Sequence, residues 1–156
     1  MNCLIVCVGT IKEDYYTQAV NEYATRLSRF DKVRIIEVPE AKIPKNPSDA
    51  DIENVKKQEC ASLLKQVKGY VIALDKVGKK LTSEEFSEKL DKLSQITSTA
   101  TFVIGGSYGL TDEFRKSVDY LLSFSDFTFP HQLMRVILLE QLYRATTISK
   151  NITYHK

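Results

Sequence analysis

The sequence lacks the segments that mark exported or membrane-spanning proteins. It has no run of about 18 apolar residues that could cross a bilayer. Its first residues, MNCLIVCVGTIKEDYY, have no basic segment before the apolar run and no small-residue cleavage site, so a signal peptide is not expected. We therefore expect a cytoplasmic protein without a membrane partner.

Cysteine and histidine are scarce, with three and two residues respectively. An odd number of cysteines in a cytoplasmic chain argues against disulfides. Cys3 and Cys7 are four residues apart in an apolar run, so both are expected on the same side of a strand, in the core. A metal site that used them would need further ligands, and only His131 and His155 are available, so no metal is expected.

Neither positive nor negative charge is in large excess, because the chain has 22 Lys and Arg against 20 Asp and Glu, for a net charge of +2. This balance excludes a protein that binds nucleic acid through overall charge alone. Local clusters such as Lys76, Lys79 and Lys80 still allow contact with RNA. Ordinary solvated surfaces account for the same clusters equally well.

What the sequence does contain is an alternation of apolar strands with amphipathic helices. Strands are predicted over 3–9, 32–38, 69–75, 100–106 and 120–125, and helices over 13–29, 49–67, 83–94 and 131–149, with a short helix after residue 111. Ser48 or Asp49 should cap the second helix, Thr82 with Glu85 forms a capping box, and Pro130 suits the first turn of the last helix. The order predicts one α/β domain over 1–156, with a mainly parallel sheet and flanking helices.

Four predicted strands have ends that point to one edge of the sheet, and three of these ends carry glycine, or polar residues that break an apolar run. The four ends are 8–9, 74–75, 104–106 and 123–129. Ligands of parallel sheets bind beyond such ends. The stretch IGGSYGL (104–110) is neither a dinucleotide fingerprint nor a phosphate-binding loop, and a tight turn explains it as well as ligand contact does. The stretch KVGKK (76–80) is predicted to be a turn.

The segment SFSDFTFPHQLMRV (123–136) alternates like a half-buried strand, but its polar residues and Pro130 oppose one. The pattern alone leaves strand and ligand loop open. His131 fits a helix-capping or core role. The helix that follows has too many apolar residues for one stripe, which predicts burial on a second side and a homodimer.

Charged side chains on this apolar helix need partners. Glu140 and Arg144 are four residues apart and can pair with each other, whereas Arg135 needs an acid from elsewhere in the chain. The final TYHK is consistent with a free terminus or with an aromatic and basic contact to RNA. From these patterns alone we infer an α/β ligand-binding protein.

Several segments in the same order resemble one family. They are VGTIKEDYY (8–16), LDKVGKKLTSEEF (74–86), FVIGGSYGL (102–110), LSFSDFTFPHQLMRVILLEQLYRA (122–145) and the final YHK. Together they make the chain similar, from end to end, to the ribosomal RNA large subunit methyltransferase H family of the knotted SPOUT class.

The resemblance implies a homodimeric fold with a C-terminal trefoil knot, and S-adenosylmethionine as methyl donor for N3 of a pseudouridine in 23S rRNA of the assembled ribosome. It places the donor at Leu74, Gly105, Phe124, Ser125, Asp126, Phe127, Thr128 and Phe129.

The same resemblance makes His155 a candidate proton acceptor. Tyr154 would stack on or orient the base, and Arg144 would contact phosphate or orient a ligand. In the 124–129 loop the phenylalanines are expected to pack the loop down, while the intervening polar residues hold its turns. A knotted enzyme that acts on tRNA and a non-catalytic ribosome-binding paralogue are the alternatives.

Overall fold

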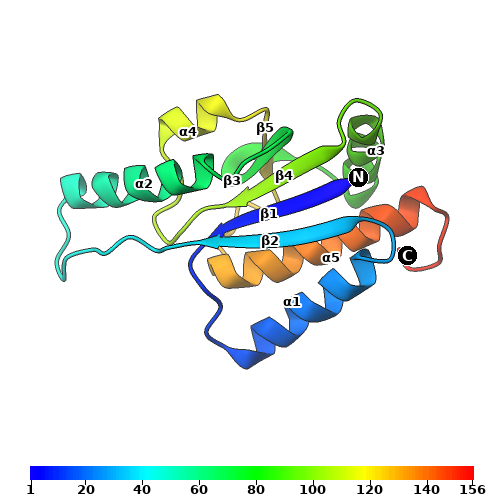
Figure 1. Cartoon of the computed structure of the whole chain (residues 1–156), viewed down its shortest axis with the longest axis horizontal. Coiled ribbons are helices and arrows are strands. Elements are labelled where there is room, and N and C mark those ends of the chain that lie inside the picture. The colour runs from blue at the N-terminus through cyan, green and yellow to red at the C-terminus, as the bar shows by residue number, and fades with distance from the viewer.

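A computed structural model describes all residues, 1–156. Its five strands form one sheet in the order β2-β1-β4-β3-β5, and every neighbouring pair is parallel (Figure 1). The strands are β1 (Asn2–Val8), β2 (Lys32–Val38), β3 (Tyr70–Lys80), β4 (Thr99–Ile104) and β5 (Tyr120–Ser123). The helices are α1 (Asp14–Leu27), α2 (Asp49–Leu64), α3 (Ser83–Ser94), α4 (Asp112–Ser117) and α5 (His131–Ser149). The predicted α/β class is confirmed.

Helices cover both faces of the sheet, with α2 and α4 on one side and α1 and α5 on the other (Figure 1). Alternate residues of β1 enter two separate cores, because successive side chains of a strand point to opposite faces. Cys3, Ile5 and Cys7 pack with apolar residues of α1, α3 and α5. Leu4, Val6 and Val8 pack with apolar residues of α2 and α4. The expectation that Cys3 and Cys7 share a buried side is confirmed.

Short-range capping motifs determine several helix starts. Ser48 and Asp51 form a capping box at the start of α2, and Thr82 and Glu85 form another at the start of α3. Helix α5 begins at His131 as predicted, although Pro130 is its N-cap residue and not part of its first turn. No helix is both long enough and apolar enough to pass through a membrane.

The prediction that 76–80 is a simple turn was wrong. Strand β3 continues to Lys80, and its pairing with β5 shifts register between Leu74 and Lys79, both of which align with Leu122. The chain crosses β5 closely at Gly78, where a Cβ atom would lie 2.6 Å from the carbonyl carbon of Leu121. Only glycine allows this approach, which lets the strand resume its pairing after the irregularity.

The C-terminal strand is shorter than predicted, because β5 ends at Ser123 and not at residue 125. Residues 124–130 are irregular and lead directly into α5. The ambiguous alternating segment is therefore a loop. It lies at the carboxyl edge of the sheet, beside the ends of β3 and β4.

Candidate functional site

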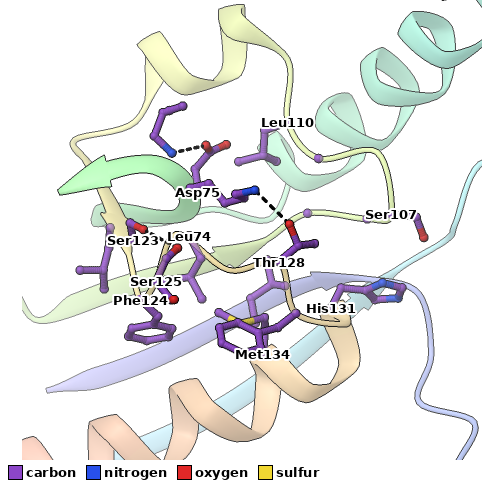
Figure 2. Close-up of a pocket in the computed structure, with 18 of the residues that line it drawn as sticks. Leu74, Asp75, Ser107, Leu110, Ser123, Phe124, Ser125, Thr128, His131 and Met134 are labelled. Carbon is purple, nitrogen blue, oxygen red and sulfur yellow. Dashed lines mark hydrogen bonds between the residues drawn. The ribbon is translucent and has the colours of Figure 1, made fainter. Parts of the chain in front are cut away.

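A cavity of about 850 Å³ opens at the carboxyl edge of the sheet. The irregular part of β3, the loops after β4 and β5 and the first turn of α5 enclose it (Figure 2). Its lining comprises Leu74–Val77, Ile104–Leu110, Arg115, Leu122–Ser125, Phe127–His131 and Met134. The volume is in the range of small-molecule sites. The cavity lies where parallel sheets bind their ligands, as the strand ends predicted.

The wall formed by the strands is apolar. Leu122 is buried, Ile104 is 4% exposed, and Leu74, Phe124 and Met134 are half-buried parts of the larger core. These side chains suit a flat apolar ligand group, whose polar edge must then bond to backbone N–H and C=O groups.

The glycine stretch after β4 is both a tight turn and part of the cavity wall, so the two readings of IGGSYGL do not exclude each other. The amide of Gly109 donates to the carbonyl of Gly106 at 3.0 Å, and Gly109 has a φ of +82°. A Cβ atom at Gly105 would lie 3.0 Å from Leu110 Cδ2, so a side chain there would displace the turn.

A buried carboxyl lies behind this turn. Glu59 on α2 is 3% exposed, and its Oε2 accepts the amide N–H of Ala41 at 3.1 Å. Its Oε1 has no hydrogen-bond partner and faces Gly106, where an added Cβ atom would lie 2.7 Å from it. Burial raises the pKa of Glu59, although the bond from Ala41 opposes the rise. No sequence pattern pointed to this residue.

Serine hydroxyls hold the loop after β5. Ser123 Oγ donates to the Ser125 carbonyl at 3.1 Å, and Ser125 Oγ accepts the amide of Phe127 at 3.0 Å. Phe124 and Phe129 are half-buried, but Phe127 is 78% exposed. The expectation that the phenylalanines pack the loop down is therefore wrong for Phe127.

Seven of the eight residues predicted to bind the donor line this one cavity. The exception is Asp126, whose exposed carboxylate pairs with the ammonium of Lys80. Thr128 Oγ1 accepts a hydrogen bond from Lys76 Nζ at 3.0 Å (Figure 2). Two lysines of β3 thus bind the loop after β5 through a hydrogen bond and an ion pair.

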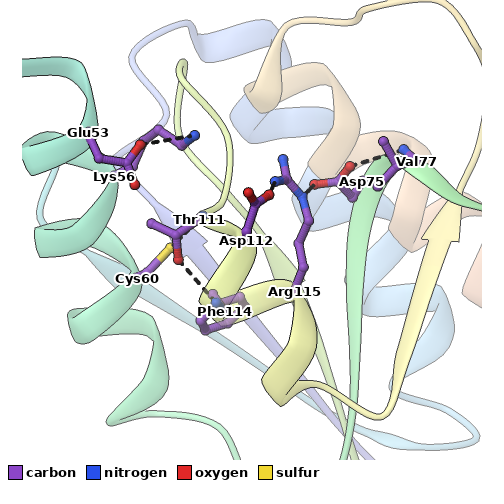
Figure 3. Close-up of polar contacts among 9 residues, drawn as sticks. All are labelled: Glu53, Lys56, Cys60, Asp75, Val77, Thr111, Asp112, Phe114 and Arg115. Atoms are coloured by element: carbon purple, nitrogen blue, oxygen red, sulfur yellow. Dashed lines mark hydrogen bonds and ion pairs between the residues drawn. The ribbon is translucent and has the colours of Figure 1, made fainter. Parts of the chain in front are cut away.

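Sequence reasoning missed a second polar cluster at the cavity. Arg115 Nε donates to Asp75 Oδ2 at 2.7 Å, and its NH1 donates to Asp112 at 2.7 Å (Figure 3). Asp75 Oδ1 also accepts the amide of Val77 at 3.0 Å. The pairing joins α4 to β3 over a separation of 40 residues, so no local sequence pattern predicts it.

His131 lines the cavity as the first residue of α5, and no side chain caps this helix. Burial lowers the pKa of its imidazole and Arg135 lowers it further, while Glu40 acts in the opposite direction. The ring is therefore neutral at pH 7. The expected capping role is not observed.

The C-terminal tail forms a further polar cluster with Glu140 and Arg144 of α5. Glu140 Oε1 accepts from Arg144 NH2 at 2.6 Å and from the Tyr154 hydroxyl at 3.1 Å. His155 Nδ1 lies 3.1 Å from Arg144 NH1, and its Nε2 lies 2.8 Å from Glu84 Oε1. The predicted pairing of Glu140 with Arg144 is confirmed.

These contacts constrain the protonation of the tail. A guanidinium only donates hydrogen bonds, so Nδ1 of His155 must accept from Arg144 and its Nε2 must carry the proton that Glu84 accepts. Burial and the hydrogen bond to Glu140 raise the pKa of Tyr154. Tyr154 therefore remains a neutral phenol near pH 7.

The structure brings Arg144, Tyr154 and His155 together but not at the cavity, because none of them lines it. Helix α5 has 19 residues, and a helix of that length spans about 27 Å. The cavity lies at its first turn, and the tail cluster gathers around Glu140 and Arg144, nine and thirteen residues after His131, which corresponds to roughly 14 and 20 Å along the helix. Within one chain the two groups of predicted site residues are therefore far apart.

Comparison with known proteins identifies the family. The family described as predicted SPOUT methyltransferase matches residues 1–155. The chain is 48% identical to the ribosomal RNA large subunit methyltransferase H of Lactiplantibacillus plantarum and 48% identical to that of Alkaliphilus oremlandii, over the full length of both proteins in each case. The chain belongs to the ribosomal RNA large subunit methyltransferase H family.

Solved structures support the fold expected of a methyltransferase H. A probable methylase from Haemophilus influenzae superposes with a TM-score of 0.55 at 15% identity, over 99% of this chain and 70% of the other. A methyltransferase from Legionella pneumophila, solved with bound S-adenosylmethionine, gives 0.54 at 12% identity, over 93% and 66%. As a member of this family, the chain has the knotted α/β fold of SPOUT enzymes.

Proposed function

We propose that this protein transfers a methyl group from S-adenosylmethionine to N3 of a pseudouridine in 23S rRNA of the assembled ribosome. The observation that carries the proposal is the cavity at the carboxyl edge of the sheet, which gathers Leu74, Gly105 and the 124–129 loop in a chain of this family. Because the proposed substrate is ribosomal RNA, we propose that the protein acts in the cytoplasm.

The cavity residues fit the donor. Leu74, Ile104 and Phe124 offer an apolar bed for adenine, and backbone groups of the glycine turn and of the 124–129 loop lie at its edge. Bound there, S-adenosylmethionine supplies a methyl group attached to a sulfonium, from which a neutral thioether departs as a good leaving group. The protein then has to hold donor and acceptor in line and exclude water.

A second copy of the chain is needed to complete the site. Two α5 helices packed in opposite directions would bring the tail of one chain to the cavity of the other, whereas within one chain the tail is bonded to Glu140 and Arg144, roughly 14 to 20 Å along α5 from His131. Leu133, Val136 and Ile137 are half-buried apolar residues of α5 and would form part of such a contact. We therefore propose a homodimer with two composite sites.

In the composite site His155 accepts the proton that N3 of pseudouridine must lose to become nucleophilic. Its Nδ1 lone pair is engaged by Arg144 in the free tail, so the tail must rearrange when the substrate binds. Tyr154 remains protonated and orients or stacks on the base. Arg144 is then free to contact phosphate.

The substrate is tested by mass spectrometry of 23S rRNA from a deletion strain, with and without the gene restored. We expect a methylated pseudouridine that disappears on deletion and returns on complementation. A loss of methylation in tRNA alone would support the tRNA-directed alternative. Unchanged rRNA and tRNA, together with no binding of S-adenosylmethionine in calorimetry, would support a non-catalytic ribosome-binding role.

The composite site is tested by mixing two inactive variants. Gly105→Val displaces the wall of the cavity and His155→Ala removes the proposed base, so each homodimer should be inactive. A mixed dimer retains one intact cavity and one intact tail, and we expect methylation of 70S ribosomes to return. No recovery in a verified mixed dimer would contradict the composite site, and full activity of His155→Ala alone would exclude the histidine as base.

A further inference from the structure

Three of the large apolar side chains that remain exposed line the same cavity. They are Val77, Tyr108 and Phe127, with exposed fractions of 72%, 41% and 78%. Val77 lies in β3 at its irregularity, Tyr108 in the loop after β4 and Phe127 in the loop after β5. The other exposed large apolar residues, Tyr15, Leu64, Ile96 and Ile152, are not part of the lining. Isolated exposed apolar residues are ordinary, but a group around a cavity indicates an interaction site.

The backbone on both sides of Tyr108 is held by hydrogen bonds and by a buried neighbouring residue. It occupies the tip of the turn closed by the hydrogen bond from Gly109 to Gly106. Leu110, which follows the turn, is 1% exposed, and the amide of Thr111 donates to the sulfur of Cys60 at 3.5 Å. Its ring stacks on no other aromatic ring of the chain. A fixed backbone thus presents a free aromatic face at the cavity.

The geometry of methyl transfer determines what must lie against this rim. In an in-line displacement the attacking atom approaches the methyl carbon from the side opposite to sulfur, at about 3–3.5 Å. With the donor inside the cavity, the acceptor base must therefore sit at the opening. A base in folded RNA reaches such a position only after it leaves its stack, and it then needs a new flat surface.

We propose that Tyr108 is the stacking platform for the acceptor base, and thus a specificity-determining residue. The inference rests on the proposed function, in which the acceptor is a single unstacked base of rRNA. Phe127 belongs to the loop that holds the donor, and Val77 has no ring. Of the tyrosine and phenylalanine side chains that line the cavity, Tyr108 alone is outside the set of residues assigned to the donor.

The test compares Tyr108→Leu, which keeps apolar volume but removes the ring, with Tyr108→Phe, which keeps the ring. Tyr15→Leu serves as control, because Tyr15 is 64% exposed and lies outside the cavity lining. We expect Tyr108→Leu to lower kcat/KM for ribosomes about 10- to 100-fold, mainly through KM. Tyr108→Phe and Tyr15→Leu should behave as wild type. Calorimetry should give the same affinity for S-adenosylmethionine in all four proteins.

Several results would overturn the inference. Tyr108→Leu with wild-type KM would show that no base stacks there. A parallel loss of donor affinity would assign the ring to the donor site, and loss of the dimer in sedimentation would assign it to a subunit contact. If wild-type protein binds the donor but leaves rRNA unmethylated, the proposed function fails, and the inference fails with it. Wild-type protein that methylates rRNA alongside an unimpaired Tyr108→Leu overturns the inference alone.

Discussion

The guanidinium of Arg135 donates to the carboxylate of Glu37 at 2.6 Å, which joins the last helix to the edge strand. Arg135 is 2% exposed, and its second amino group donates to the Gly9 carbonyl at 3.1 Å. The sequence predicted that this arginine needs an acid from elsewhere, and Glu37 is that acid. The pair fixes the first turns of α5, where His131 and Met134 line the cavity.

We expect Glu37→Ala to destabilise the fold by about 3 kcal/mol, because it leaves a buried guanidinium without its counter-charge. Arg135→Met should cost less, since water can solvate the partly exposed Glu37. Urea unfolding followed by circular dichroism measures both. Glu53→Ala is the matched control, because the Glu53 pair with Lys56 is long, at 3.7 Å, and on the surface (Figure 3). Equal losses for Glu37→Ala and the control would contradict the prediction.

Gly78→Ala should destabilise the fold by on the order of 3 kcal/mol, because its Cβ would overlap the backbone of β5 at Leu121. Gly109→Ala is the comparison variant, because it introduces backbone strain without steric overlap. It has a φ of +82° and no atom within 4 Å of the added Cβ, so it should cost only about 1 kcal/mol. Unfolding in urea compares the two variants. Equal stability would show that the crossing is not tightly packed.

Glu59 should make stability depend on pH. Its pKa is raised in the folded state by burial, so the folded protein favours the protonated carboxyl. The contribution is fully present below the ordinary pKa of glutamate and is lost as pH rises through the raised value. Glu59→Gln stays neutral, so it should lose less stability than wild type between pH 5 and pH 8. Parallel curves for the two proteins in urea titrations at these pH values would refute the prediction.

The thiols of Cys3 and Cys7 should be inert in the folded protein. Burial raises the pKa of each to about 12, so almost no thiolate exists at pH 8. We expect mass spectrometry after iodoacetamide treatment at pH 8 to show both residues unmodified, and all three cysteines modified in urea. Rapid labelling of Cys3 or Cys7 in native conditions would mean that the core around β1 opens.

Local chemistry explains which parts of the fold were predictable. The bounds of α3 and α5 matched because Thr82 with Glu85 and the proline before His131 act within one helical turn. The return of Lys79 and Lys80 to β5 was not predictable, since it depends on a crossing between distant segments.

The same limit applies to the site. Leu74, Gly105 and the 124–129 loop were found through strand ends and family resemblance. Arg115 and Glu59 were not, because their partners Asp75 and Ala41 are 40 and 18 residues away. Tyr108 was visible in the sequence, but its exposure at the cavity was not.

The cavity wall is spread over residues 74 to 134, so its last contributor arrives near the end of the chain. A partly synthesised polypeptide that lacks α5 has neither Met134 nor the helix that closes the larger core. The proposed donor site is therefore complete only after synthesis has passed the first turn of α5, and we expect shorter, unfinished chains to lack it.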